Sequence, residues 1–271
     1  MPYLRDLRES RELLGNLVAR ELKGQYRRTV FGQLWSLLNP VATMLIYTIV
    51  FSVFLGAQPP RGDPSGLDVF ALWLMAGLLP WLFVARVVNG CIEVLIGNES
   101  LIKKVYFPRA HLPLSVLLSV GVTWLIEMVV LGVALSLAGA FVVPWLPLTL
   151  VVMVLLGIFA VGLGMLAAIA NAHFRDTQHL VAIALQMWFY LTPIVYPLDV
   201  VANATRSDPW AMTIFQLNPM EHFVAVFRDL MYASRWPDSV DLIWCVCSAL
   251  VVGMFGFVVF TRSERRLAEI L

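Results

Sequence analysis

The stretch from residue 29 to residue 58 constrains the fold of this chain more than any other feature of the sequence. It contains no Lys, Arg, Asp, Glu or His, and most of its side chains are apolar. In a helix, about 20 apolar residues cross the roughly 30 Å of hydrocarbon in a bilayer. The preceding basic stretch, which ends in Arg27 and Arg28, is typical of a helix that lies on the membrane surface and leads into a span. A soluble amphipathic helix followed by a buried core helix is disfavoured because the uncharged stretch is too long.

The composition of the whole chain agrees with a membrane protein. Of the 271 residues, 60% are hydrophobic and 14% are charged, whereas a soluble domain carries about 25% charged residues. So little charge cannot cover a water-exposed globule. We therefore predict an all-α integral membrane protein, built as a single transmembrane domain over residues 1–271.

Six stretches are long and apolar enough to be predicted as spans, although the fifth is short. Their apolar runs are continuous rather than alternating, which favours helices over a β-barrel. The predicted spans are residues 34–55, 69–88, 112–137, 146–170, 180–195 and 242–260.

The basic residues between these spans favour one orientation. Fourteen Lys and Arg residues fall on the sides assigned to the cytoplasm and four on the opposite sides, which is a strong positive-inside bias. Both termini are then cytoplasmic. Arg86, near the inner end of the second span, is expected to extend its side chain to the interface. The four outer residues are Arg61, Arg206, Arg228 and Arg235.

Two helices that do not span are expected on the cytoplasmic side. Residues 1–30 are predicted to form an amphipathic interfacial helix. Residues 96–107 are predicted to form a short helix that stops before Pro108, because a residue preceding proline disfavours helical backbone angles. The apolar face of the first helix is Leu14, Val18, Leu22 and Tyr26, and the exposed residues of the second are Asn98, Glu99, Lys103 and Lys104.

Residues 196–238 are rich in proline but too apolar for an ordinary loop. Asn218 and Pro219 suit the N-cap and first positions of a helix, with Glu221 in its first turn. We predict short re-entrant helices on the outer side between the fifth and sixth spans, tolerated where protein covers their ends.

Hydroxyl and aromatic side chains recur on one face of two predicted spans. Such a face could line a path for sugars, because aromatic rings stack on the C–H faces of pyranoses while hydroxyls exchange hydrogen bonds. Ordinary helix packing, in which these residue types are also common, is the alternative. The residues are Ser36, Thr43, Tyr47, Phe51 and Phe54 in the first span and Gln186, Phe189 and Tyr190 in the fifth.

Ionisable groups within the spans and inner loops are few. Glu127 falls in the middle of the third span, where a carboxylate must face protein or water. It could carry protons or pack beside Thr123, and the lack of a second acidic residue in any span favours packing. His173 and His179 lie six residues apart without a third ligand nearby, so a polar turn is favoured over a metal site and no metal is predicted.

Sequence signals of an enzyme are absent. The chain has no Gly-rich phosphate loop ending in Gly-Lys-Ser/Thr and no His-Glu-x-x-His. Energy for uphill transport must therefore come from another chain.

Five segments resemble, in the same order, segments of the ABC-2-type permeases that export O-antigen, capsule and teichoic acid polysaccharides. They are RELKGQYRRTVFGQLWSLLNP, GNESLIKKVYFPRAHLPLS, HFRDTQHLV, LTPIVYP and LNPMEHFVAVFRDLMY, and the resemblance covers nearly the whole chain. It implies a homodimer in the bacterial inner membrane that works with two copies of a separate ATPase. That ATPase would bind ATP and Mg²⁺, and this chain would hold no cofactor and bind no nucleic acid.

The resemblance also implies a substrate and roles for individual residues. The substrate would be a polyprenyl-pyrophosphate-linked polysaccharide; the alternatives are an ABC-2 exporter of a small lipid or drug, a membrane glycolipid enzyme, and a proton-coupled transporter that requires Glu127. Aromatic residues of the first and fifth spans would line the channel, and Arg27 and Arg28 would meet the pyrophosphate. The coupling helix would contact the ATPase through Asn98, Glu99, Ser100, Leu101, Lys103, Lys104 and Tyr106, and the outer gate would include Pro193, Tyr196, Pro197 and Pro219.

Overall fold

The computed structural model describes residues 11–25, 34–54, 56, 58–105, 107–204 and 209–270, and within these ranges all regular structure is helical. The side chain of Ser36 is not among those described. The predicted roles of Arg27, Arg28 and Tyr106 concern residues outside these ranges.

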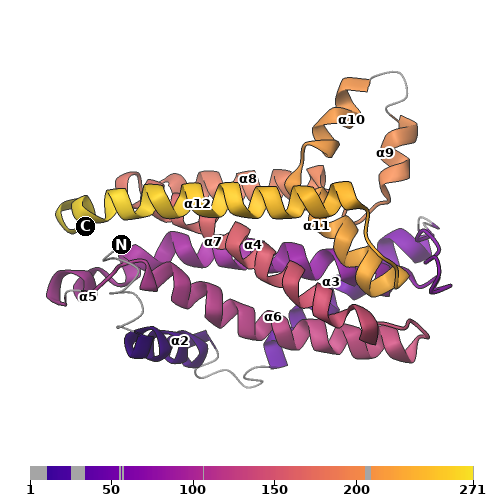
Figure 1. The fold of residues 1–271 in the computed structure, drawn as a ribbon, viewed down its shortest axis with the longest axis horizontal. Helices are drawn as coiled ribbons and strands as arrows, with labels where there is room; N and C mark the ends of the chain where they lie inside the picture. The colour runs from indigo at the N-terminus through magenta and orange to yellow at the C-terminus, as the bar shows by residue number, and fades with distance from the viewer. Residues whose placement is uncertain are drawn as a thin grey trace.

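Four long apolar helices lie side by side and form the body of the protein (Figure 1). Each is long and apolar enough to cross a membrane, which confirms the prediction of a multi-pass, all-helical membrane protein. They are α4 (Phe70–Gly97), α6 (His111–Leu137), α7 (Leu146–His173, preceded by the short η2, Val143–Trp145) and α12 (Ser239–Ile270).

Two further apolar elements correspond to the predicted first and fifth spans. The α3 helix (Leu34–Tyr47) continues into η1 (Thr48–Phe54), and α8 covers Thr177–Leu191. At 1.5 Å per residue, the 15 residues of α8 extend only about 22 Å, less than the hydrocarbon thickness. A count of six spans therefore stays a prediction.

The α7 helix lies between α4 and α12 and packs against both. Its close approach to α12 depends on glycines in both helices. A methyl group on Gly256 of α12 would lie 2.2 Å from the carbonyl oxygen of Gly162 on α7, and one on Gly162 would lie 2.5 Å from the carbonyl oxygen of Val252. The backbones of the two helices are thus in direct contact, as small residues permit in membrane proteins.

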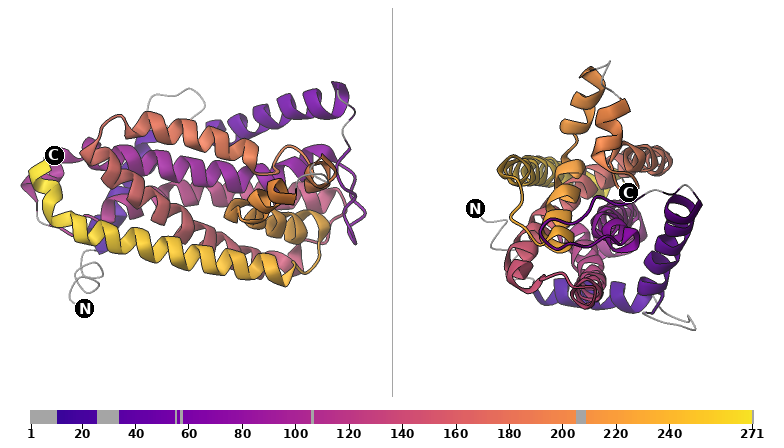
Figure 2. Two further views of the ribbon diagram at one scale, coloured as in Figure 1. Left: turned by 90° about the horizontal axis from the view of Figure 1, so that it is seen from above. Right: turned by 90° about the vertical axis from the view of Figure 1, so that its right-hand side faces the viewer.

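One end of the bundle carries the short helices predicted for residues 196–238, and we call it the α11 end. These elements are α9 (Leu198–Ala204), α10 (Pro209–Gln216), α11 (Pro219–Phe227) and η3 (Arg228–Ala233). In Figures 1 and 2, α9 and α10 project from the bundle while α11 packs on it. The predicted start of α11 is confirmed, because the Asn218 side chain accepts a 3.0 Å hydrogen bond from the backbone N–H of Met220.

The opposite end, which we call the α5 end, carries the two predicted non-spanning helices (Figure 1). The α2 helix (Arg11–Gln25) packs on α6, with Leu17 buried, the predicted Leu14, Val18 and Leu22 half-buried, and Arg20 exposed. The α5 helix covers only Glu99–Lys104. It is shorter than the predicted helix over residues 96–107 because α4 runs on to Gly97.

Candidate functional site

The first candidate site is a cavity of about 860 Å³ near the α5 end, between α2, α4 and α6. Arg20 of α2 and Arg86 of α4 line it together with Ser119 and Thr123 of α6. Arg20 Nη2 donates a 2.7 Å hydrogen bond to Oδ1 of Asn98, at the start of α5. The cavity therefore offers guanidinium and hydroxyl groups at the predicted cytoplasmic end of the bundle.

An ion pair joins α4 and α6 beside this cavity. Arg86 Nη1 lies 2.7 Å from Oε1 of Glu127, whose side chain is 1% exposed. Arg86 was expected to extend to the interface, but it pairs with Glu127 within the bundle instead. Glu127 is buried and hydrogen-bonded, as the packing interpretation expects, and its partner is Arg86. Removing one partner of a buried pair costs about 3–5 kcal/mol, less where a partner is partly exposed as Arg86 is.

The exposed surface of α5 is formed by Ser100, Lys103 and Lys104, with Glu99 and Leu101 half-exposed. Glu99 Oε1 lies 2.6 Å from Lys103 Nζ, and this hydrogen bond holds the pKa of Glu99 below its usual value. These positions agree with the predicted exposure.

Asn98 is the exception, because it is buried rather than exposed. It lies at the junction of α4 and α5, where its Nδ2 donates a 2.8 Å hydrogen bond to the carbonyl of Val94 while its Oδ1 accepts from Arg20. Asn98 therefore joins α2, α4 and α5, and its buried side chain offers little surface to a partner.

The second candidate site is an aromatic groove of about 330 Å³ between α3, α4 and α8. Five of the eight residues predicted to line a channel meet here: Thr43, Tyr47, Gln186, Phe189 and Tyr190. The rings of Tyr47 and Phe189 are nearly parallel, with centroids 6.3 Å apart, and Trp81 of α4 lies 5.8 Å from Phe189. Aromatic side chains of three helices therefore form one surface.

Two other predicted channel residues, Phe51 and Phe54, do not line this groove. Phe51 contacts Tyr47 from the next turn, at 6.0 Å between centroids, and Phe54 is 77% exposed. Trp81 was missed in the sequence, because nothing distinguishes it there from the neighbouring aromatic residues Trp73 and Phe83.

At the α11 end, Asn218 connects α11 to the end of α8. Besides capping α11, it accepts a 2.8 Å hydrogen bond from Nε1 of Trp188 and donates to the carbonyl of Leu191 and the hydroxyl of Thr192 at 3.1 and 2.9 Å. The start of α11 is therefore tied to the chain that leaves α8.

Arg228 holds the predicted outer-gate segment from its other side. Its Nη1 and Nη2 donate hydrogen bonds of 2.7 and 2.6 Å to the carbonyls of Pro193 and Ile194, and its guanidinium lies 3.7 Å from the ring centroid of Trp73. In the sequence, Arg228 is predicted only as an outer charge. The adjacent Arg228 and Asp229 interrupt an apolar run, and this was the signal that they have partners inside the protein.

The third candidate site is a cavity of about 860 Å³ at the α11 end. The predicted gate residues Pro193 and Pro197 line it, the Tyr196 hydroxyl donates to the carbonyl of Tyr190, and Pro219 is the first residue of α11. Glu221, His222 and Asp241 also meet in this cavity; no periodicity in the sequence links Asp241 to the other two.

His173 and His179, considered as metal ligands in the sequence, are both exposed, and His173 Nδ1 lies 2.9 Å from the carbonyl of Ile169. Within the described ranges, the His and acidic side chains close enough to share one cation are Glu221, His222 and Asp241.

Several known proteins are similar to this chain over most of its length. Residues 12–232 match the family model of the ABC-2 type transporter. The O-antigen export system permease protein RfbA of Myxococcus xanthus is 30% identical over 98% of both chains, and the protein of the same name from Klebsiella pneumoniae is 28% identical over 96% of this chain and 95% of its own length. The polysialic acid transport protein KpsM of Escherichia coli is 24% identical over 93% of this chain and 94% of its own. With a family match over most of its length and relatives along all of it, this chain belongs to the ABC-2 type transporter family of membrane proteins.

Proposed function

We propose that this chain is the permease subunit of an ABC exporter that moves a polyprenyl-pyrophosphate-linked polysaccharide across a bacterial inner membrane, from the cytoplasmic to the outer side. The observation that carries this proposal is full-length similarity to permeases named for O-antigen and polysialic acid export. The aromatic groove supports a glycan as the substrate, because aromatic rings stack on the C–H faces of sugars.

The proposed assembly is a homodimer with two copies of a separate ATPase, which would bind ATP and Mg²⁺. Each permease would contribute six spans, with α3–η1 as the first and α8 as the fifth. The α2 helix would lie at the cytoplasmic interface, and both termini would be cytoplasmic. The positive-inside bias supports this orientation.

The α5 helix is the proposed contact with the ATPase, through exposed Ser100, Lys103 and Lys104 and the neighbouring Tyr106. The bond between Arg20 and Asn98 supports this role, because it gives α5 a connection to α2. Movement of the ATPases would then be transmitted through α5 to α2, which lines the cavity at the α5 end.

The substrate would pass from the cavity at the α5 end to the aromatic groove. Arg20 and Arg86 line the cavity, and the proposed pyrophosphate contacts Arg27 and Arg28 follow α2 in the chain. Tyr47 and Phe189 would contact the sugars, and the segment around Pro193 and Pro197 would act as the outer gate. Arg can offer two parallel donors to a phosphate, which suits it to this role.

Depletion of the chain should test this function. We expect surface polysaccharide to fall and lipid-linked glycan to accumulate on the cytoplasmic leaflet, with wild-type chain restoring both. The variant Tyr47→Ala with Phe189→Ala should export glycan roughly thirtyfold more slowly, since two lost ring contacts at about 1 kcal/mol each amount to about 2 kcal/mol. Quantification of both glycan pools checks this result.

Phe141→Ala is the matched control, because Phe141 is a 70% exposed aromatic residue outside the groove, and it should export at the wild-type rate. Unchanged surface polysaccharide after depletion would refute the proposal. Equal export by the groove variant and the control would favour an exporter of a small lipid or drug.

A further inference from the structure

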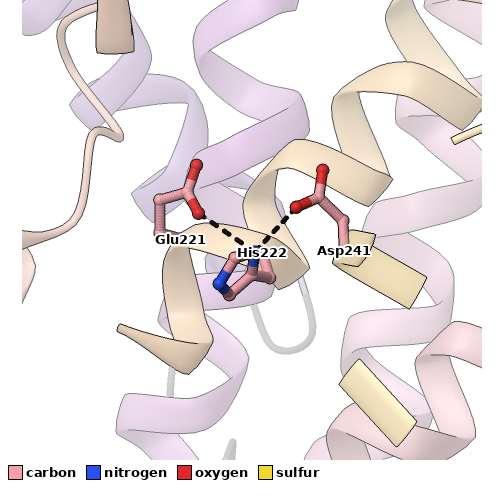
Figure 3. A group of neighbouring side chains, drawn as sticks. All are labelled: Glu221, His222 and Asp241. Atoms are coloured by element: carbon pink, nitrogen blue, oxygen red, sulfur yellow. Dashed lines mark hydrogen bonds and ion pairs between the residues drawn. The ribbon is translucent and has the colours of Figure 1, made fainter. Parts of the chain in front are cut away.

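The side chains of Glu221, His222 and Asp241 meet where α11 packs on the first turn of α12 (Figure 3). The two carboxylates approach the imidazole from opposite sides and point to the same nitrogen. His222 Nδ1 lies 2.7 Å from Asp241 Oδ1 and 3.3 Å from Glu221 Oε2. One atom from each residue lies within 4.8 Å of the other two.

The hydrogen bonds of His222 fix which nitrogen faces the carboxylates. Nε2 lies 2.8 Å from the carbonyl oxygen of Gln216, which can only accept, so Nε2 carries a hydrogen. The ring also stacks on Trp244, with centroids 5.1 Å apart and planes 6° apart. Nδ1 is therefore held toward the two carboxylates, as in metal sites where a histidine donates from its other nitrogen to a carbonyl.

The cluster places two carboxylates around one imidazole in a largely buried position. Glu221 and His222 are only 7% and 5% exposed. Arg228 acts on Glu221 from a distance, but its guanidinium bonds to the carbonyls of Pro193 and Ile194.

The cavity at the α11 end gives a hydrated ion access to this cluster. Six acidic side chains and three arginines line it, so its charge attracts cations. The acidic residues are Asp63, Asp199, Glu221, Asp229, Asp238 and Asp241, and the arginines are Arg61, Arg228 and Arg235.

We propose that Glu221, His222 and Asp241 form a binding site for a divalent transition-metal ion of the Zn²⁺ or Mn²⁺ class, which joins α11 to α12. An imidazole beside two carboxylates suits these ions better than Mg²⁺ or Ca²⁺, which prefer oxygen ligands. Ligands at about 2.0–2.2 Å from tetrahedral zinc lie roughly 3.3–3.6 Å from one another, so the three atoms need only small movements, and water from the cavity can complete the shell.

A metal here would act on the outer-gate segment through α11. Asn218 and Arg228, at the two ends of α11, hold the chain that follows α8. Joining α11 to α12 would therefore fix the predicted gate segment to the last long helix. This inference concerns binding and does not depend on which substrate is exported.

Titration of the purified full-length chain with Co²⁺ tests the site, because cobalt bound to nitrogen and oxygen ligands absorbs visible light. The wild type should bind one equivalent with a visible spectrum, and Zn²⁺ should displace it. Asp241→Asn and Glu221→Gln preserve shape but remove a charged ligand; each should weaken binding at least tenfold and abolish the rise in melting temperature that Zn²⁺ gives the wild type.

Asp238→Asn is the matched control. Asp238 is an exposed acid that lines the same cavity outside the cluster, so this variant should bind Co²⁺ like the wild type. A wild-type chain without a cobalt spectrum overturns the proposal. A spectrum and affinity that are the same in Asp241→Asn and Glu221→Gln as in the wild type overturn it as well.

Discussion

Replacing Gly256 with alanine should sharply reduce the amount of folded protein in the membrane. The added methyl group would lie 2.2 Å from the carbonyl oxygen and 2.8 Å from the carbonyl carbon of Gly162. Both are backbone atoms, so no side chain can turn away, and α7 and α12 must separate along their contact. Overpacking costs about 1–3 kcal/mol where side chains can adjust, and a backbone contact should exceed that range.

By helix propensity alone, alanine at residue 256 should stabilise α12 by about 1 kcal/mol relative to glycine. A loss of stability must then come from the contact with α7. Gly121→Ala in α6 is the control, since a methyl group there meets nothing within 4 Å. Size-exclusion profiles of the detergent-solubilised variants measure the folded fraction. Equal yields for the two variants would show that α7 and α12 do not touch at these glycines.

Replacing Arg228 with methionine should unfold the α11 end at a lower temperature and stop export. The substitution keeps an unbranched, flexible side chain but removes two hydrogen bonds to the carbonyls of Pro193 and Ile194 and the stacking on Trp73. Hydrogen bonds from a charged donor are worth about 1.5–3 kcal/mol each, so we expect a loss of about 3 kcal/mol or more. Thermal unfolding of the purified chain, read beside surface polysaccharide, measures both effects.

Arg228→Lys should recover only part of this loss, because an ammonium group cannot hold two carbonyls in a planar fork while lying flat on an indole ring. The control is Arg235→Met. Arg235 lies 2.7 Å from Asp229 but is 53% exposed, and such pairs contribute at most about 1 kcal/mol. Equal melting temperatures for the Arg228→Met and Arg235→Met proteins would show that Arg228 does not stabilise the gate segment.

Much of the fold follows from local properties of the sequence. The four long helices were predictable because length and apolarity are sufficient to define a span. The start of α11 was predictable because Asn218 and Pro219 have backbone preferences that act within a few residues. The faces that carry Tyr47 and Phe189 could each be recognised from their spacing, and the two rings are in contact, but their role as a channel lining stays a prediction.

What the sequence did not reveal depends on contacts between distant segments. Glu127 and Arg86 are 41 residues apart on different helices, so no local pattern in the sequence links the carboxylate to its basic partner. His222 and Asp241 are 19 residues apart on different helices. The buried position of Asn98 depends on α4 continuing to Gly97, although the residues between 88 and 97 look like the start of a loop.

Cysteine labelling of α5 tests most directly the claim that export is driven from the cytoplasmic side. Cys91 and Cys245 are buried, so exposed Cys247 alone is first replaced by serine. In this background, a membrane-impermeant maleimide should label Asp68→Cys, in the loop before α4, in intact spheroplasts. It should label Ser100→Cys only after the membrane is opened. Labelling of Ser100→Cys from outside intact spheroplasts would contradict the account, because no ATPase in the cytoplasm could then reach α5.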